Sequence, residues 1–293
     1  MTSPSPEAIA ANDAGGELLD ARRFAEAIEH CERASALAPD WYAPCCNLGV
    51  AYKHAKDFRR SLAASLRAIE LDAEKAGGGA FWNAGVAATA LADWPRARWA
   101  WSKLEIQLPP GDGPPDMNIG TTPIRVSCDD EPEVVWCHRI DPARARIESI
   151  PTPETGRRYR DLLLHDGEPR GKRRYGERLL SVFNELAVLE QSPFRTFGVE
   201  LMAPSAGDVD ELYALVAKGC SAALEDWSAS LEIVCKQCSE GVPHEHEPRP
   251  EPPWKAERRL AVATTDDDVF ELIEKWAGKR AGRGASQAVL LTT

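Results

Sequence analysis

Residues 41–72, with the sequence WYAPCCNLGVAYKHAKDFRRSLAASLRAIELD, decide the fold of the first third of the chain. They contain Gly49, an aromatic residue nine positions later at Phe58, and a small residue three positions after that at Ser61. A small residue lets the backbones of two helices approach closely where they cross, and an aromatic side chain fills the space where the helices diverge. The stretch therefore predicts two antiparallel helices that pack against each other.

The same pattern occurs before and after this stretch, so the chain contains an internal repeat. The matching residues are Gly15, Phe24 and Ala27, then Gly49, Phe58 and Ser61, then Gly85, Trp94 and Ala97. The first two units are 34 residues apart, and the glycines at 77–79 can absorb the two extra residues that displace the third unit. Such helices cannot bury their apolar faces alone, so neighbouring units must stack. A generic bundle of helical hairpins is the alternative.

Over about residues 7–110 the pattern resembles the tetratricopeptide repeat (TPR) family, whose L-G-x2-Y core is matched by Leu48, Gly49 and Tyr52. The resemblance implies an α-solenoid of three repeats over residues 1–110. It also implies a concave groove, lined by the first helix of each repeat, that holds a peptide or a partner helix. By motif position the groove residues are Asn12, Gly16, Cys46, Asn47, Val50, Lys53, His54, Trp82, Asn83, Val86 and Thr89.

The family members that bind chaperones carry a clamp of Lys, Asn and Arg side chains that holds two carboxylates. In this chain Asn47 matches the clamp, whereas the other four positions hold Asn12, Gly16, Gly79 and Asn83. The resemblance therefore implies a more apolar ligand, or a groove that packs against the later part of the chain itself.

The composition bounds the function. A chain of 293 residues can form two or three domains, and 43% apolar residues supply cores for them. The net charge of −11 argues against coating nucleic acid or an anionic membrane as the main task. Eight scattered cysteines, together with the lack of a secretory signal or a long apolar run, indicate reduced thiols and a cytoplasmic location.

The middle of the chain changes period. Residues 111–120 are rich in proline and glycine and predict a linker. Residues 121–193 hold short β-rich runs separated by turn residues, which predicts a small barrel or curled sheet. Cys137 and His138 are adjacent on one such run and would point to opposite faces of a strand, so they do not form a nucleophile and its base.

A basic stretch lies within this β-rich segment, interleaved with Tyr159 and Tyr175. Basic and aromatic side chains on a small barrel can bind single-stranded nucleic acid or an acidic protein surface. A solvated hairpin is the alternative interpretation. The basic residues are Arg157, Arg158, Arg160, Arg170, Lys172, Arg173, Arg174 and Arg178.

Residues 194–293 contain two strand-helix-strand patterns in succession. The predicted elements are strands at 197–202, 230–235, 258–265 and 287–292, and helices at 208–227 and 267–280. The order β-α-β-β-α-β predicts a ferredoxin-like sandwich, with two helices on one face of an antiparallel sheet. This fold supports many functions and implies no particular activity.

An insertion at 235–256 interrupts the hairpin between the two central strands. Cys235 and Cys238 have C-x2-C spacing, and His244 and His246 follow. Two thiolates and two imidazoles form the ligand set of a closed, structural zinc site, so the insertion predicts a zinc knuckle. The alternative is an exposed, reduced turn. A catalytic zinc would need an open position, with Glu245 or Glu247 as the base.

The sequence thus favours a cytoplasmic, bacterial interaction adaptor of three parts, with a chaperone-like or toxin-neutralising role among those that would suit it. A nucleic-acid-binding module is the first alternative. A metal-dependent enzyme is the second, although the chain contains no P-loop, nucleophile elbow, H-E-x-x-H motif or dinucleotide fingerprint.

Overall fold

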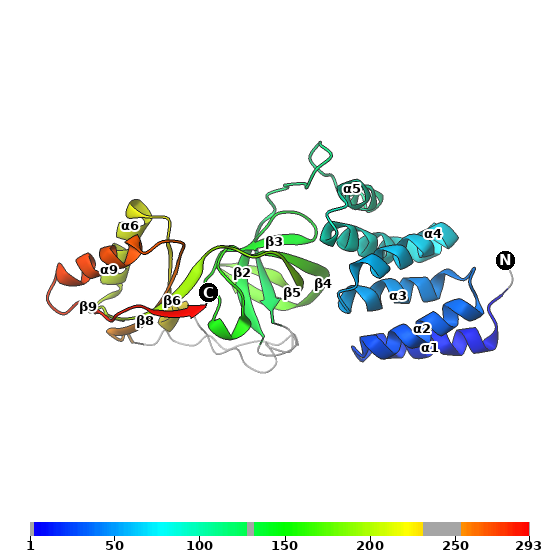
Figure 1. Cartoon of the computed structure of the whole chain (residues 1–293), viewed down its shortest axis with the longest axis horizontal. Helices are drawn as coiled ribbons and strands as arrows, with labels where there is room; N and C mark the ends of the chain where they lie inside the picture. Colours follow the sequence, from blue (N-terminus) through cyan, green and yellow to red (C-terminus); the bar gives the residue numbers. More distant parts are fainter. Residues whose placement is uncertain (1–2, 128–131, 231–252, 293) are drawn as a thin grey trace. The chain divides into compact units, whose positions relative to one another are not determined.

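The structure is a computed structural model that describes residues 3–127, 132–230 and 253–292 (Figure 1). The chain divides into two compact units, which are described separately. Unit 1 consists of residues 1–119 together with two short later segments, Ile140–Arg144 and Leu164–Asp166. Unit 2 contains the rest. Among the described residues, no helix is both long enough and apolar enough to cross a membrane.

Unit 1 is built on helical hairpins. Its helices are α1 (Pro6–Asp20), α2 (Phe24–Leu37), α3 (Tyr42–His54), α4 (Phe58–Ala90) and α5 (Trp94–Lys103). Several begin with a residue that satisfies free backbone N–H groups: the Ser5 hydroxyl accepts from Ala8 N–H, and Asp57 and Asp93 accept from the residue three positions on. Consecutive helices pack against each other from α1 through α5.

Helix α4 is two helices in one run. The backbone leaves helical geometry at Asp72 and again at Gly77, where φ is +62°. A positive φ is unstrained for glycine and rare for other residues. The glycine run therefore does what the repeat spacing predicted: it absorbs the extra residues and separates the second helix of repeat two from the first helix of repeat three.

The three repeat glycines have equivalent surroundings. A Cβ atom added to Gly15 would lie 2.3 Å from the Cys31 sulfur, one added to Gly49 would lie 2.6 Å from the Ser65 oxygen, and one added to Gly85 would lie 2.6 Å from the Trp101 ring. Each contacted residue is sixteen positions further on, in the second helix of the same repeat. The helices of each pair thus approach as closely as the small residue predicted.

The first sheet of unit 2 forms from strands β1 (Gly120–Val126), β2 (Glu133–Arg139), β3 (Arg144–Ile147), β4 (Leu162–Tyr175) and β5 (Arg178–Glu190). The strands are neighbours in sequence order, and β1 also pairs in parallel with β5, so the sheet curls back onto its first strand. A short 3-10 helix, η1 (Pro153–Thr155), lies between β3 and β4. The prediction that the chain beyond the helices is rich in sheet is confirmed.

The second sheet contains β6 (Arg195–Met202), β7 (Ala223–Asp226), β8 (Glu257–Thr264), β9 (Gly284–Ala285) and β10 (Val289–Thr292). Its strand order is β10-β6-β8-β7, and β9 pairs with β6 beyond the end of β10. Strand β6 pairs antiparallel with β8, β9 and β10, and β7 pairs antiparallel with β8.

Two helices, α6 (Ala206–Gly219) and α9 (Asp268–Gly278), cover one face of the second sheet. Their core residues Leu212, Val216 and Ile273 pack with Val199 and Val262 of the strands. The short helix α7 (Trp227–Ser230) and Ile150 pack on the opposite face, against Ala261 and Ala263. Residues 194–293 thus contain both strands and helices, and the ferredoxin-like assignment stays a prediction.

One boundary in this region was predicted wrongly. The helix predicted over 208–227 ends at Gly219, where Cys220 is extended, and residues 223–226 form β7 instead. A Cβ on Gly219 would lie 2.7 Å from Leu272 of α9, so this glycine marks a close approach between the two helices. Pairing with β8 overrides the helical preference of the sequence ALED. The strand predicted at 230–235 lies almost entirely outside the described residues.

Candidate partner-binding groove

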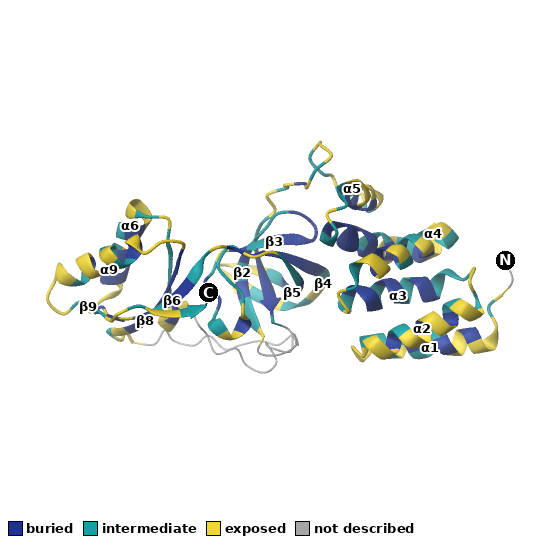
Figure 2. Ribbon diagram, in the orientation of Figure 1, coloured by how far each residue is buried: buried dark blue, intermediate teal, exposed yellow. Residues whose placement is uncertain are grey.

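The predicted groove residues come from the first helix of each repeat, which are α1, α3 and the second part of α4. Asn12 and Asn47 link the first two repeats, because the Asn47 side-chain amide donates to the Asn12 oxygen at 3.0 Å. Figure 2 marks which residues of these helices are buried. The structure divides the predicted groove residues into a partly exposed set and a buried set.

Apart from His54, which is described below, the partly exposed set contains Asn12, Gly16, Cys46, Asn47, Val50 and Trp82. It includes at least one residue from every repeat, so it spans the stack. The indole of Trp82 meets that of Trp101 edge to face, with ring centroids 5.0 Å apart. Burial raises the pKa of the Cys46 thiol to about 11, so this thiol stays protonated at neutral pH. The exposed part of the groove is thus uncharged.

The C-terminal end of α3 is occupied by an acidic side chain of the same chain. Asp166, in the second later segment of unit 1, lies with one oxygen 3.0 Å from Lys53 Nζ and the other 3.5 Å from His54 Nε2. The exposed fractions of the three side chains are 6% for Lys53, 11% for His54 and 5% for Asp166. A buried ammonium group requires such a partner, because an isolated charge away from water is very costly.

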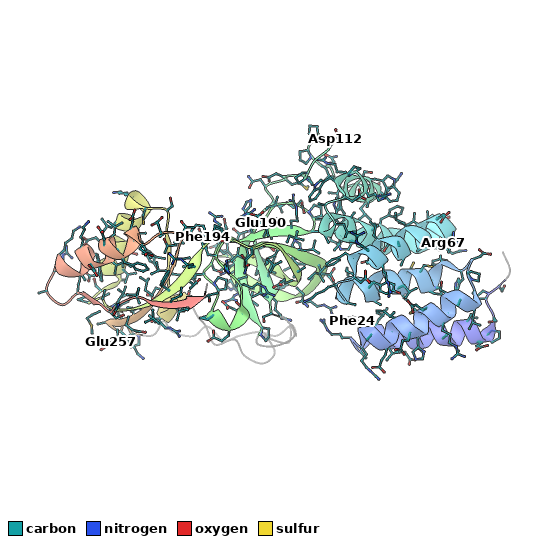
Figure 3. All side chains as sticks on the ribbon, in the orientation of Figure 1. Phe24, Arg67, Asp112, Glu190, Phe194 and Glu257 are labelled. Carbon is teal, nitrogen blue, oxygen red and sulfur yellow. The ribbon has the colours of Figure 1, made fainter. Side chains whose placement is uncertain are left out.

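Neighbouring side chains hold this end in place. The ring of His54 stacks on Phe24, labelled in Figure 3 at the start of α2, with centroids 4.6 Å apart and planes 12° from parallel. Asn83, Val86 and Thr89 of the third repeat are buried as well. Asn83, Val86 and Thr89 therefore belong to the folded core of unit 1 and cannot contact a partner.

The first later segment of unit 1 is attached through Arg144. Its guanidinium pairs with Asp141 at 2.6 Å, donates to the Pro115 carbonyl at 2.7 Å, and lies over the Trp94 ring of α5 at 4.9 Å. The backbone N–H of His165 donates to the Ala143 carbonyl, which joins the two later segments. Asp141, Arg144 and Asp166 were not predicted as site residues, because they lie in the β-rich segment, far from the helices in sequence.

The basic stretch is mostly used in structural contacts. Arg157 forms a two-pronged ion pair with Glu185, Arg158 donates to the Ser192 carbonyl, and Arg173 donates to the Val134 carbonyl while lying over the Trp136 ring. Arg160 and Arg170 lie near Glu148 and Glu168. The three remaining basic residues of the stretch, Lys172, Arg174 and Arg178, are exposed and form no ion pair within the described part of the chain.

The four predicted zinc ligands, Cys235, Cys238, His244 and His246, lie outside the described residues. Within residues 3–127, 132–230 and 253–292, no group of three or more His, Cys, Asp or Glu side chains could hold a metal ion. Burial raises the pKa of the Cys137 thiol well above its usual value, which makes it a poor nucleophile.

Comparison with known proteins yields solved TPR domains. No family model and no curated protein matches the chain. The second TPR domain of Spaghetti (RPAP3), bound to the HSP90 peptide SRMEEVD, is 23% identical in sequence to this chain. The match covers 35% of this chain and 94% of the Spaghetti domain, with a TM-score of 0.33. The first TPR domain of the same protein, bound to the same peptide, is 21% identical, covers 35% and 81%, and gives 0.33.

The TPR domain of Sgt2 from Aspergillus fumigatus is 22% identical, covers 34% of this chain and 66% of that one, and gives a TM-score of 0.32. These similarities concern about the N-terminal third of the chain. In that part the helix pairs recur with the predicted spacing, and their glycines make the same close approach. Residues 6–103 thus form helical hairpins that recur with the predicted spacing.

Proposed function

We propose that this chain is a protein-interaction adaptor and that its TPR-type repeats hold a segment of a partner protein. The observation that supports this proposal best is the partly exposed set of groove residues, which is drawn from all three repeats. Stacked repeats give a continuous concave surface of this kind, and such surfaces bind extended or helical segments.

The side chains of the groove indicate the chemistry of the partner. Cys46, Val50 and Trp82 offer apolar surface, and the amides of Asn12 and Asn47 can bond to a partner backbone. Lys53 and His54, the groove residues that could meet a carboxylate, already lie against Asp166. A peptide rich in carboxylates, such as the SRMEEVD peptide bound by the Spaghetti domains, therefore suits this groove less well than a mainly apolar segment with free backbone groups.

A pair of full-length variants tests this proposal. Val50→Arg places a charge in the groove, and the matched control Ala25→Arg places the same charge on the exposed surface of α2. Proteins captured by the unaltered chain from an extract of its own organism would be compared with those captured by each variant. Loss of a captured protein with Val50→Arg but not with Ala25→Arg supports the groove. Equal capture by both variants refutes it.

A second function, binding of single-stranded nucleic acid, is favoured by one observation. The hairpin between β4 and β5 exposes Tyr175 next to Lys172, Arg174 and Arg178. Exposed aromatic rings stack on bases while cations contact phosphates. Binding to a single-stranded oligonucleotide that weakens steeply with salt, and is lost in Tyr175→Ala, would support this function, whereas salt-independent retention excludes it.

We also retain three proposals that come from the sequence. The strand order β10-β6-β8-β7, with two helices on one face, supports a ferredoxin-like assignment for residues 194–293. Cys235, Cys238, His244 and His246 are proposed to bind one structural zinc ion, which elemental analysis of the unaltered chain and of Cys235→Ser would test. A cytoplasmic location suits the proposed reduced thiols.

A further inference from the structure

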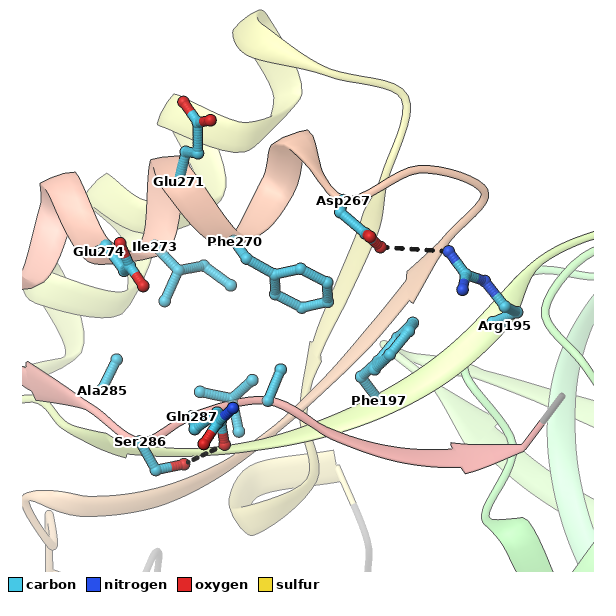
Figure 4. Close-up of a pocket in the computed structure, with 12 residues that line it drawn as sticks. Arg195, Phe197, Asp267, Phe270, Glu271, Ile273, Glu274, Ala285, Ser286 and Gln287 are labelled. Carbon is cyan, nitrogen blue, oxygen red and sulfur yellow. Dashed lines mark hydrogen bonds and ion pairs between the residues drawn. The ribbon is translucent and has the colours of Figure 1, made fainter.

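A cleft of about 470 Å³ lies in unit 2 between helix α9, strand β6 and the link from β9 to β10 (Figure 4). Its apolar lining includes Phe197, Val199, Phe270 and Ile273. The rings of Phe197 and Phe270 meet edge to face with centroids 5.0 Å apart, and Figure 4 shows both at the end of the cleft nearest Arg195. The sheet is therefore incompletely covered by α9 at this edge.

The open cleft adjoins an unprotected sheet edge. Strand β10 is at the end of the sheet and pairs with β6 through Val289↔Gly198 and Leu290↔Phe197. Leu290 is opposite Phe197, so it shares the face on which the cleft lies. Val289 is 60% exposed and Leu290 is 45% exposed. An edge strand with exposed apolar residues and free backbone groups is a template for another strand.

Acidic side chains line the helix side of the cleft. Asp267, Glu271 and Glu274 all contribute to its lining from α9 or the turn before it. Asp267 is paired with Arg195 at 3.1 Å, and Glu271 with Lys275 at 3.4 Å. Glu274 has no ion pair in the described ranges, and Figure 4 shows its carboxylate directed toward the link between β9 and β10. The rim therefore carries negative charge beside an apolar floor.

We propose that this edge binds an extended segment of a partner protein that carries both apolar and basic side chains on one face, at every second position. The segment would add to β10 as a further strand, because β10 ends the sheet and no strand of residues 3–127, 132–230 or 253–292 pairs with its outer side. Side chains of an added strand point alternately to the two faces. Those on the α9 face would place apolar groups in the cleft and basic groups near Glu274, while Val289 would be covered on the other face.

The test uses the full chain and three short blocked peptides. The probe is Ac-Val-Thr-Lys-Thr-Val-NH2, the charge control is Ac-Val-Thr-Glu-Thr-Val-NH2, and the backbone control is the lysine peptide with proline in place of its first threonine. NMR signals of Ala285, Ala288 and Leu290 report on the site. We expect the lysine peptide alone to shift these signals. Glu274→Lys should weaken its binding by about tenfold or more, whereas the matched exposed helical variant Glu29→Lys should leave it unchanged.

Other outcomes overturn the proposal. Equal binding of the glutamate peptide would show that charge does not select the occupant, and equal binding of the proline peptide would show that no strand is added. A shift of the same signals on raising the protein concentration without peptide would assign the edge to a second copy of the chain. The site is independent of the repeat groove, so Val50→Arg should not affect it.

Discussion

Replacing Asp166 by alanine should destabilise unit 1 strongly. The substitution removes the carboxylate that lies 3.0 Å from Lys53 Nζ, while the ammonium group remains only 6% exposed. Removing one partner of a buried ion pair typically costs about 3–5 kcal/mol, because the other charge is left buried and unpaired. Since both side chains are almost fully buried, solvent screening does not reduce this figure substantially.

The companion variants separate the ion pair from the rest of the packing. Lys53→Met should cost less than Asp166→Ala, because it leaves His54 near the carboxylate and retains an apolar chain of similar length. The double variant Lys53→Met with Asp166→Leu should regain most of the loss, since an apolar pair of similar volume often replaces a buried ion pair without net cost.

Urea unfolding followed by far-ultraviolet circular dichroism measures these differences, because most of the helices belong to unit 1. A free-energy change of less than about 1 kcal/mol for Asp166→Ala would refute the reasoning, since that is the value expected for an exposed ion pair. Additive effects of the two single substitutions in the double variant would show that Lys53 and Asp166 are not coupled.

Three further predictions follow from single contacts. Gly49→Ala should destabilise the repeats by about 1–3 kcal/mol in urea unfolding, because its Cβ would lie 2.6 Å from the Ser65 oxygen, and Gly16→Ala, which has open space, should cost far less. Burial raises the pKa of Glu133 above its ordinary 4.5, so the folded state gains stability as pH falls from 7 toward 4.5 and loses that stability as pH rises through the raised pKa. Glu133→Gln should therefore flatten the dependence of the unfolding free energy on pH. An unchanged pH dependence would contradict this assignment. Cys46, whose pKa is raised to about 11, should react with iodoacetamide at pH 7.5 more slowly than a free thiol of ordinary pKa, and a rate equal to that of free cysteine would contradict its burial.

The helical part of the fold was predictable because its determinants are local and repeated. Gly15, Gly49 and Gly85 each meet a residue sixteen positions away, a separation that belongs to one hairpin and recurs three times. The first helix of each pair, which carries the proposed groove residues, was predictable for the same reason. Their exposure was not predictable, because the residues that bury Lys53 come from a distant part of the chain.

The β-rich parts show the reverse. The alternation of residues predicted where strands occur, but β7 was assigned to a helix, since its sequence contains good helix formers and its partner β8 follows only after the long insertion. The sequence showed that residues 157–178 are rich in basic side chains, but it did not show which of these side chains have partners. Only the contacts show that Arg157 pairs with Glu185 inside unit 2 while Arg174 remains exposed.

The sequence by itself determined the three helical repeats and the change to sheet-rich structure after them. These features depend on neighbours within a few tens of residues, so a single residue pattern suffices to encode them. Tertiary structure alone decided that Asp166 pairs with Lys53 at the end of α3 and that an apolar cleft with an acidic rim opens beside β10. Lys53 and Asp166 are 113 residues apart, and such contacts arise only when separately folded segments pack together and a buried charge must find a partner.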